Sequence, residues 1–246
     1  MSGFRAALAL LTRIPARSGP NTERAVPWLP VVGASVGAGV AGIYVGLNEV
    51  LSPLVAAALA IAAGVLATGA LHEDGLADVA DAFGAGRDRD RTLEILKDPR
   101  HGTYGVLTIA LTVVTRVAAV GSMEAWTALA ALPVAHALSR AGAASLMWLL
   151  PAATPDGLGA TYSAPVTRRR VAVGAGIALV VGCALIGWYT IPAAGIAAVG
   201  AFIMGSLAMR KIGGITGDVL GGAQQLGEIG ILVLAAAAGG AIPWWR

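Results

Sequence analysis

The sequence predicts an all-α protein, a polytopic integral membrane bundle of about seven transmembrane helices in a single domain, residues 1–246. Composition is the first reason: 57% of the residues are hydrophobic and 13% are charged, whereas soluble domains carry about 25% charged residues. Length is the second reason, because an apolar helix of about 20 residues crosses the hydrocarbon core of a bilayer. Seven stretches meet this requirement: 28–48, 50–71, 103–121, 125–150, 171–190, 192–209 and 227–243.

The N-terminal arm, residues 1–25, is predicted to begin with an amphipathic helix that lies at the membrane surface. The apolar run in "MSGFRAALALLTRIP" is short and flanked by arginines, which is not the pattern of a signal peptide. We expect Pro15 to end this helix. Pro53 and Pro192 stand just inside the second and sixth predicted spans, where the first turn of a helix tolerates proline.

The basic residues predict the orientation of the bundle. Fourteen of the 17 lysines and arginines fall in the arm and in the loops after the second, fourth and sixth spans, and basic loops remain in the cytoplasm. We therefore expect a cytoplasmic N-terminus, an external C-terminus and a location in the cytoplasmic (inner) membrane. Loops 72–102, 151–170 and 210–226 would form the active face toward the cytoplasm. Of the acids, only Glu49 and Glu124 are expected outside.

Two classes of site are excluded by composition. The single cysteine, Cys183, cannot form an intrachain disulfide framework or a CxxC metal site. The net charge of +3 arises from topology, and no long basic block with interleaved aromatic residues indicates nucleic-acid binding.

An acidic stretch, "ALHEDGLADVADAFGAG", directly follows the second apolar segment. Asp74, Asp78 and Asp81 are spaced i, i+4, i+7, so on a helix they lie within about 60° of one another. Such a stripe of carboxylates can bind Mg²⁺ or Mn²⁺, which prefer hard oxygen ligands. The alternative is a solvated acidic face, but the interleaved apolar residues and nearby glycines favour a metal site.

Two further polar segments precede predicted spans. In "EILKDPRHGTYG", Lys97 and Arg100 could clamp phosphates, next to Asp98, and Gly102 would let the backbone approach a ligand closely. In "KIGGITGDVLGGAQQLGE", the glycines with Thr216, Gly217 and Asp218 predict a tight loop that could approach a phosphate or supply another metal ligand. Taken alone, each segment could also be an ordinary membrane-boundary segment or a connector between helices. Together with the aspartates, both segments become candidate parts of a binding site.

Three ionisable residues fall within predicted spans. Arg140 is costly in hydrocarbon, so we expect it to face the bundle interior or a polar cavity, where it is a candidate substrate-binding residue. The placement of Arg116 stays open, and His136 is expected to be a packing residue rather than a ligand.

Taken together, these segments resemble the cobalamin synthase family, the adenosylcobinamide-GDP ribazoletransferases. The resemblance covers nearly the whole chain, from "LALLTRIP" and "WLPVVGASVGA" through "LHEDGLADVADAFG" and "EILKDPRHGTYG" to "GGITGDVLGGAQQLGE". The middle segment "PAATPDGLGATYSAP" is similar to the family's Gly-Leu-Gly loop. The sequence departs from the family pattern at Pro99, where a serine is common, and at His101, where a hydrophobic residue is usual. Glu73 also stands at a position that is usually not acidic.

The resemblance implies an Mg²⁺-dependent transferase that joins adenosylcobinamide-GDP to α-ribazole or its 5′-phosphate and releases GMP. Metal ions on Asp74, Asp78 and Asp81, together with Asp218, would hold the pyrophosphate. A carboxylate or His72 would accept the proton of the attacking hydroxyl. The implied partners are these substrates, the bilayer and other enzymes of nucleotide-loop assembly, and both a monomer and a homo-oligomer fit the sequence.

Two alternatives come from other classes. A CDP-alcohol phosphotransferase of lipid synthesis also uses aspartates at helical spacing, but here Asp78 and Val79 occupy the positions of its Ala-Arg pair. A transporter would place ionisable groups near the midplane of the membrane, whereas this sequence concentrates its charge at one surface.

Overall fold

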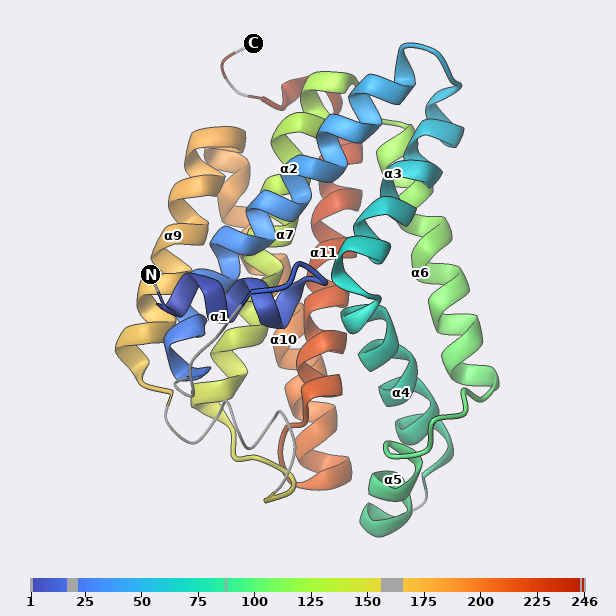
Figure 1. Ribbon diagram of the computed structural model, residues 1–246, viewed down its shortest axis with the longest axis vertical. Helices are drawn as coiled ribbons and strands as arrows, with labels where there is room; N and C mark the ends of the chain where they lie inside the picture. The colour runs from blue at the N-terminus through green and yellow to red at the C-terminus, as the bar shows by residue number, and fades with distance from the viewer. Residues whose placement is uncertain (1, 17–21, 87, 156–165, 244, 246) are drawn as a thin grey trace.

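The structure is a computed structural model that describes residues 2–16, 22–86, 88–155, 166–243 and 245. It is a bundle of helices, and the described residues contain no β-strand, only one isolated bridge between Ala152 and Ile215 (Figure 1). The all-α prediction is confirmed. The helices are α1 (Ser2–Leu11), α2 (Leu29–Asn48), α3 (Pro53–Thr68), α4 (Leu71–Ala85), α5 (Arg89–Ile95), α6 (Thr103–Gly121), α7 (Ala125–Leu149), α9 (Arg168–Ile186), α10 (Thr190–Ile212) and α11 (Gly217–Ala238), with short 3₁₀ helices η1 (Thr22–Trp28), η2 (Gly187–Tyr189) and η3 (Gly239–Ala241).

Several of these helices can cross a membrane. Four helical stretches among the described residues are long and apolar enough: 23–48, 103–121, 168–212 and 217–241. A fifth is possible if the bent pair α3 and α4 counts as one span. The stretch 168–212 contains two helices, α9 and α10, which are joined through η2. The membrane character is therefore supported, but the predicted count of seven spans is not confirmed.

The acidic stripe does not continue the second predicted span in a straight line. Gly69 and Ala70 both adopt left-handed backbone conformations, with φ of 68° and 59°, and α4 leaves α3 at an angle of 88°. An alanine in this conformation costs about 1–2 kcal/mol, so the surrounding structure must hold the bend in place. One such contact is the hydrogen bond from the Arg13 amide to the Ala67 carbonyl, 2.8 Å long, which ties the N-terminal arm to the end of α3.

The glycine-rich segment 211–228 is mostly helix, not the tight loop that its composition predicted. α10 continues to Ile212 and α11 already begins at Gly217, ten residues before the predicted start of the last span. Thr216 caps α11, because its Oγ1 accepts a hydrogen bond from the Val219 amide at 3.3 Å. The glycines Gly221 and Gly222 are thus buried in the first turns of a long helix.

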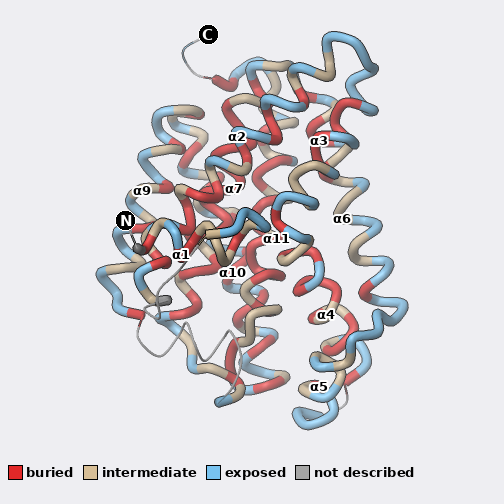
Figure 2. The backbone as a smooth tube through the Cα atoms, in the orientation of Figure 1, coloured by how far each residue is buried: buried red, intermediate tan, exposed pale blue. Residues whose placement is uncertain are grey.

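The core of the bundle centres on α7, which is buried along much of its length and contacts α2, α9, α10 and α11 (Figure 2). Small residues permit these contacts, as is common for helices that pack in lipid. At Gly37 of α2, for example, a Cβ would lie 2.8 Å from the Leu132 carbonyl carbon of α7. Arg140 faces this interior with 4% of its surface exposed, as predicted.

The segments predicted to form the active face lie in the half of the bundle that bears α5, and α5 links them (Figure 1). The Arg89 side chain donates hydrogen bonds to the carbonyls of Ile212, at 3.1 Å, and Ala153, at 2.8 Å. The Lys211 ammonium donates to the Gly86 carbonyl at 3.2 Å. Segments 72–102, 151–170 and 210–226 are thereby joined, although residues 156–165, which include the predicted Gly-Leu-Gly segment, lie outside the described residues.

Candidate active site and metal centre

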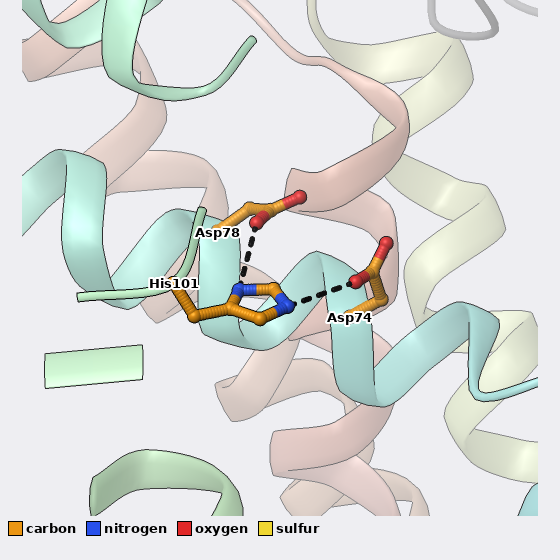
Figure 3. Close-up of side chains that lie close together, drawn as sticks. All are labelled: Asp74, Asp78 and His101. Atoms are coloured by element: carbon orange, nitrogen blue, oxygen red, sulfur yellow. Dashed lines mark ion pairs between the residues drawn. The ribbon is translucent and has the colours of Figure 1, made fainter. Parts of the chain in front are cut away.

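Two aspartates of α4 and one histidine form a group that could bind a metal ion (Figure 3). The His101 imidazole lies between the carboxylates, with Nε2 3.5 Å from Asp74 Oδ1 and Nδ1 3.6 Å from Asp78 Oδ1. One ligand atom from each residue lies within 4.8 Å of the other two. The group opens to solvent, because 61% of the Asp74 side chain and 38% of the His101 side chain are exposed. The sequence had marked His101 only as a departure from the family pattern.

Asp81, the third aspartate of the stripe, is buried and holds the loop that carries His101. Its carboxylate accepts hydrogen bonds from the amides of Gly102, at 2.6 Å, and Gly105, at 2.9 Å. The stripe therefore faces one segment, residues 101–105, as its helical spacing predicts. Asp74 and Asp78 meet the histidine, whereas Asp81 fixes the start of α6.

Asp218 approaches the same group from the start of α11. The Thr216 hydroxyl donates to Asp218 Oδ2 at 3.2 Å, and Asp218 lies close enough to Asp74 and Asp78 for their charges to interact. This proximity depends on Gly75 of α4, where a Cβ would lie 2.9 Å from the Asp218 Cα atom. The predicted fourth ligand is thus brought to the site by contact between two helices.

The donor set fits a divalent cation. Like-charged carboxylates held close together repel one another, and a bound cation relieves that repulsion. Carboxylate oxygens suit Mg²⁺ and Mn²⁺, and the imidazole of His101 adds a nitrogen donor that transition metals accept. A solvent-open position leaves room for water or phosphate oxygens among the ligands, as Mg²⁺ requires.

Arg100, one of the two residues predicted to clamp phosphates, is paired with an aspartate of the same loop. Arg100 forms a two-pronged contact with Asp98, with Nε 2.9 Å from Oδ1 and Nη2 2.7 Å from Oδ2. Hydrogen bonds from the Arg100 side chain and backbone lower the pKa of Asp98 to about 2, so the pair is charged at neutral pH. Lys97 and Arg100 are both exposed on the loop beside the metal group. For Arg100 to bind a substrate phosphate, it must leave Asp98.

Behind the aspartates lies a buried polar cluster that the sequence did not reveal. Its members come from α4, α6, α7 and α11: Glu73, Arg116, His136, Arg140, Gln224, Gln225 and Glu228. Arg116 Nη1 lies 2.8 Å from Glu73 Oε1 and 3.3 Å from Glu228 Oε1. Arg140 Nη1 lies 3.6 Å from Glu228 Oε2, and His136 Nδ1 lies 3.4 Å from the same oxygen. Two arginines therefore balance two glutamates.

The members of this cluster lie deeper in the bundle than the sequence indicated. Glu73 and Glu228, which the sequence analysis grouped with the other acids of the cytoplasmic face, have only 8% and 2% of their side chains exposed. His136 is buried, as expected of a packing residue, and it also joins the charged network. Arg116, whose placement the sequence left open, faces the interior because both glutamates lie there. The sequence feature that could have indicated this cluster is Glu228, an acid that directly precedes a long apolar run.

A cavity of about 270 Å³ connects the metal group with this cluster. Asp74 and Asp218 lie at its border, and His72, Arg140 and Gly217 also line it. Most of its remaining lining is apolar and comes from α1, α2, α7 and α11: Leu10, Leu11, Leu29, Ala143, Ala144, Met147 and Leu220. His72, which the sequence analysis named beside the carboxylates as an alternative proton acceptor, is itself buried. The cavity thus joins solvent-exposed carboxylates to an apolar interior.

The family model and the relatives that match this chain indicate the same family. A family model described as cobalamin-5-phosphate synthase matches residues 3–236. The adenosylcobinamide-GDP ribazoletransferase of Bradyrhizobium diazoefficiens is 42% identical to this chain over 250 positions, covering 96% of this chain and 94% of the relative. The protein of the same name from Escherichia coli K12 is 34% identical over 240 positions, covering 94% and 97%. No solved structure matches the chain.

Proposed function

Since the chain belongs to the cobalamin-5-phosphate synthase family, we propose that it is a membrane transferase that joins adenosylcobinamide-GDP to α-ribazole or α-ribazole 5′-phosphate. The products are adenosylcobalamin or its 5′-phosphate, and GMP. The observation that carries the site assignment is the group formed by Asp74, Asp78 and His101, which gathers metal-ligand atoms within 4.8 Å at the mouth of a cavity. The CDP-alcohol and transporter alternatives have no comparable support.

The reaction exchanges one phosphorus–oxygen bond for another. The 3′-hydroxyl oxygen of ribazole attacks the phosphorus that bears the cobinamide group, and the bond from that phosphorus to the oxygen bridging to GMP breaks. A divalent cation, which we propose is Mg²⁺, would be held by Asp74, Asp78 and His101 with Asp218 nearby, and would neutralise the pyrophosphate charge.

The protein side chains contribute in three further ways. A carboxylate of the site, or His72 in the adjoining cavity, accepts the proton of the attacking hydroxyl. Lys97 and Arg100 supply positive charge toward the phosphates, the latter after release from Asp98. Asp81 positions the loop that holds His101 and is not required as a ligand. The twelve residues named for this site by sequence thus include metal ligands, candidate proton acceptors, positioning groups and phosphate contacts.

The environment of the site follows from the topology that the basic residues predict. We propose that the end of the bundle bearing α5 and the metal group faces the cytoplasm and that the membrane is the inner membrane. Substrates then reach Asp74 and Asp78 from the cytoplasm without crossing the bilayer.

The proposal is tested with the full-length protein purified in detergent and supplied with adenosylcobinamide-GDP, α-ribazole 5′-phosphate or α-ribazole, and Mg²⁺. We expect GMP and the cobalamin product in equal amounts, loss of both on adding EDTA, and recovery with Mg²⁺. Asp78→Asn should lose at least about a hundredfold in kcat/KM, because a metal ligand is removed. Asp90→Asn, an exposed aspartate on α5, is the matched control and should retain activity. A folded wild-type protein that releases no GMP with either ribazole would contradict the assignment.

A further inference from the structure

The cavity beside the metal group differs in chemistry from the rest of the site. One border is formed by the carboxylates of Asp74 and Asp218, whereas its wall is built from apolar side chains that include Leu11, Leu29 and Met147. A ligand with a polar part at the carboxylates and an apolar part against this wall would therefore bury apolar surface without stranding polar groups.

Arg140 provides a second, independent indication of a ligand. It is 4% exposed and lines the cavity. Its Nη1 donates to the His136 carbonyl at 3.0 Å, but its Nε has no hydrogen-bond partner among the described residues. A buried donor without an acceptor costs about 1–3 kcal/mol. A ligand that brings one acceptor into the cavity would satisfy it.

The substrates of the proposed reaction differ sharply in their fit to these features. The cobinamide macrocycle is large and bears amide groups, and the guanine of the nucleotide has several donors and acceptors that an apolar wall would leave unpaired. The base of α-ribazole is a small, methylated, bicyclic aromatic ring. One of its two ring nitrogens carries the ribose, so the other is a single free acceptor.

We propose that this cavity is the binding subsite for the base of α-ribazole, an inference that rests on the proposed function. The ring packs against the apolar wall, and its free nitrogen accepts a hydrogen bond from Arg140. The attached ribose extends toward Asp74 and Asp218, which brings its 3′-hydroxyl to the site of phosphoryl transfer. The width of the cavity at α7, set by Ala144 and Met147, then limits which bases are accepted.

Two substitutions change this width in opposite directions. Ala144→Leu fills the cavity, and we expect the KM for α-ribazole to rise at least about tenfold, since even one methylene in an apolar pocket changes discrimination by about that factor. The KM for adenosylcobinamide-GDP should stay within about twofold. Met147→Ala enlarges the cavity and should raise kcat/KM for a ribazole with a larger, naphthimidazole base relative to α-ribazole by about tenfold. Leu149→Ala, on the exposed face of the same helix, is the control and should leave this preference unchanged.

The outcomes separate the subsite from the reaction. A wild-type protein without GMP release contradicts the proposed function itself. If the wild type is active but Met147→Ala leaves the base preference unchanged, the subsite assignment is wrong, whether or not Ala144→Leu folds. If Met147→Ala lowers kcat/KM equally for every ribazole, the cavity has a structural role or holds lipid, and the assignment is overturned. The same conclusion follows if folded Ala144→Leu raises the KM values for both substrates equally.

Discussion

Replacing Gly75 by alanine tests whether the close approach of α4 and α11 sets the geometry of the metal centre. A Cβ at this position would lie 2.9 Å from the Asp218 Cα atom and 3.1 Å from the Asp218 carbonyl oxygen. Both are backbone atoms, so the contact cannot be relieved by rotating a side chain. The helices must separate, and Asp218 must then move away from Asp74.

The magnitude follows from two opposing effects. Alanine gains about 1 kcal/mol over glycine in a helix interior, whereas overpacking a tight contact costs about 1–3 kcal/mol. Gly42→Ala in α2 isolates the first effect, because a Cβ there meets nothing within 4 Å. Relative to that control, Gly75→Ala should be less stable by about 1–3 kcal/mol.

The assay compares thermal unfolding of the two variants in one detergent and their Mn²⁺ affinity by electron paramagnetic resonance, with Mn²⁺ in place of Mg²⁺. We expect Gly75→Ala to unfold at a lower temperature than Gly42→Ala and to bind Mn²⁺ more weakly than the wild type. Equal stability of the two variants, with wild-type Mn²⁺ affinity in both, would refute the view that this contact positions the site.

Three further substitutions test separate parts of the structure. Asp81→Asn should weaken Mn²⁺ binding and should speed amide hydrogen exchange in residues 101–105. An asparagine side chain has one acceptor oxygen, so it leaves the Gly102 or Gly105 N–H unpaired at a cost of about 1–3 kcal/mol. Unchanged hydrogen exchange would count against this role of Asp81. Arg116→Leu should destabilise the protein by about 3–5 kcal/mol, since it leaves buried carboxylates without their cation, and a wild-type unfolding temperature would contradict the buried network. Asp98→Asn should lower the KM for adenosylcobinamide-GDP by releasing a cationic side chain, and an unchanged KM would show that this side chain does not contact the substrate.

A change of pH cannot take the place of Asp98→Asn in testing the pair of Asp98 with Arg100. The pKa of Asp98 is lowered to about 2, so its folded-state pair with Arg100 contributes above the ordinary pKa of an aspartate and is lost only as the pH falls through about 2. Between pH 5 and pH 9 the pair stays charged. The KM effect of Asp98→Asn should therefore be the same across this range.

The sequence alone determined the class of protein and one face of its site. Apolar length identified membrane-spanning helices, and the cost of a charge in hydrocarbon placed Arg140 inside the bundle. The i, i+4, i+7 spacing put three aspartates on one side of a helix, and the structure shows that side meeting residues 101–105. These conclusions depend on local periodicity and on transfer from water, both of which are properties of a single segment.

The tertiary structure decided which of those aspartates meets which partner. His101 joins Asp74 and Asp78 because the loop before α6 folds over α4, whereas Asp81 holds that loop by its backbone. Glu228 lies inside the bundle because α11 begins earlier than its apolar run suggests. Periodicity specifies which residues share a face, but only the packing of one helix against another specifies what that face contacts.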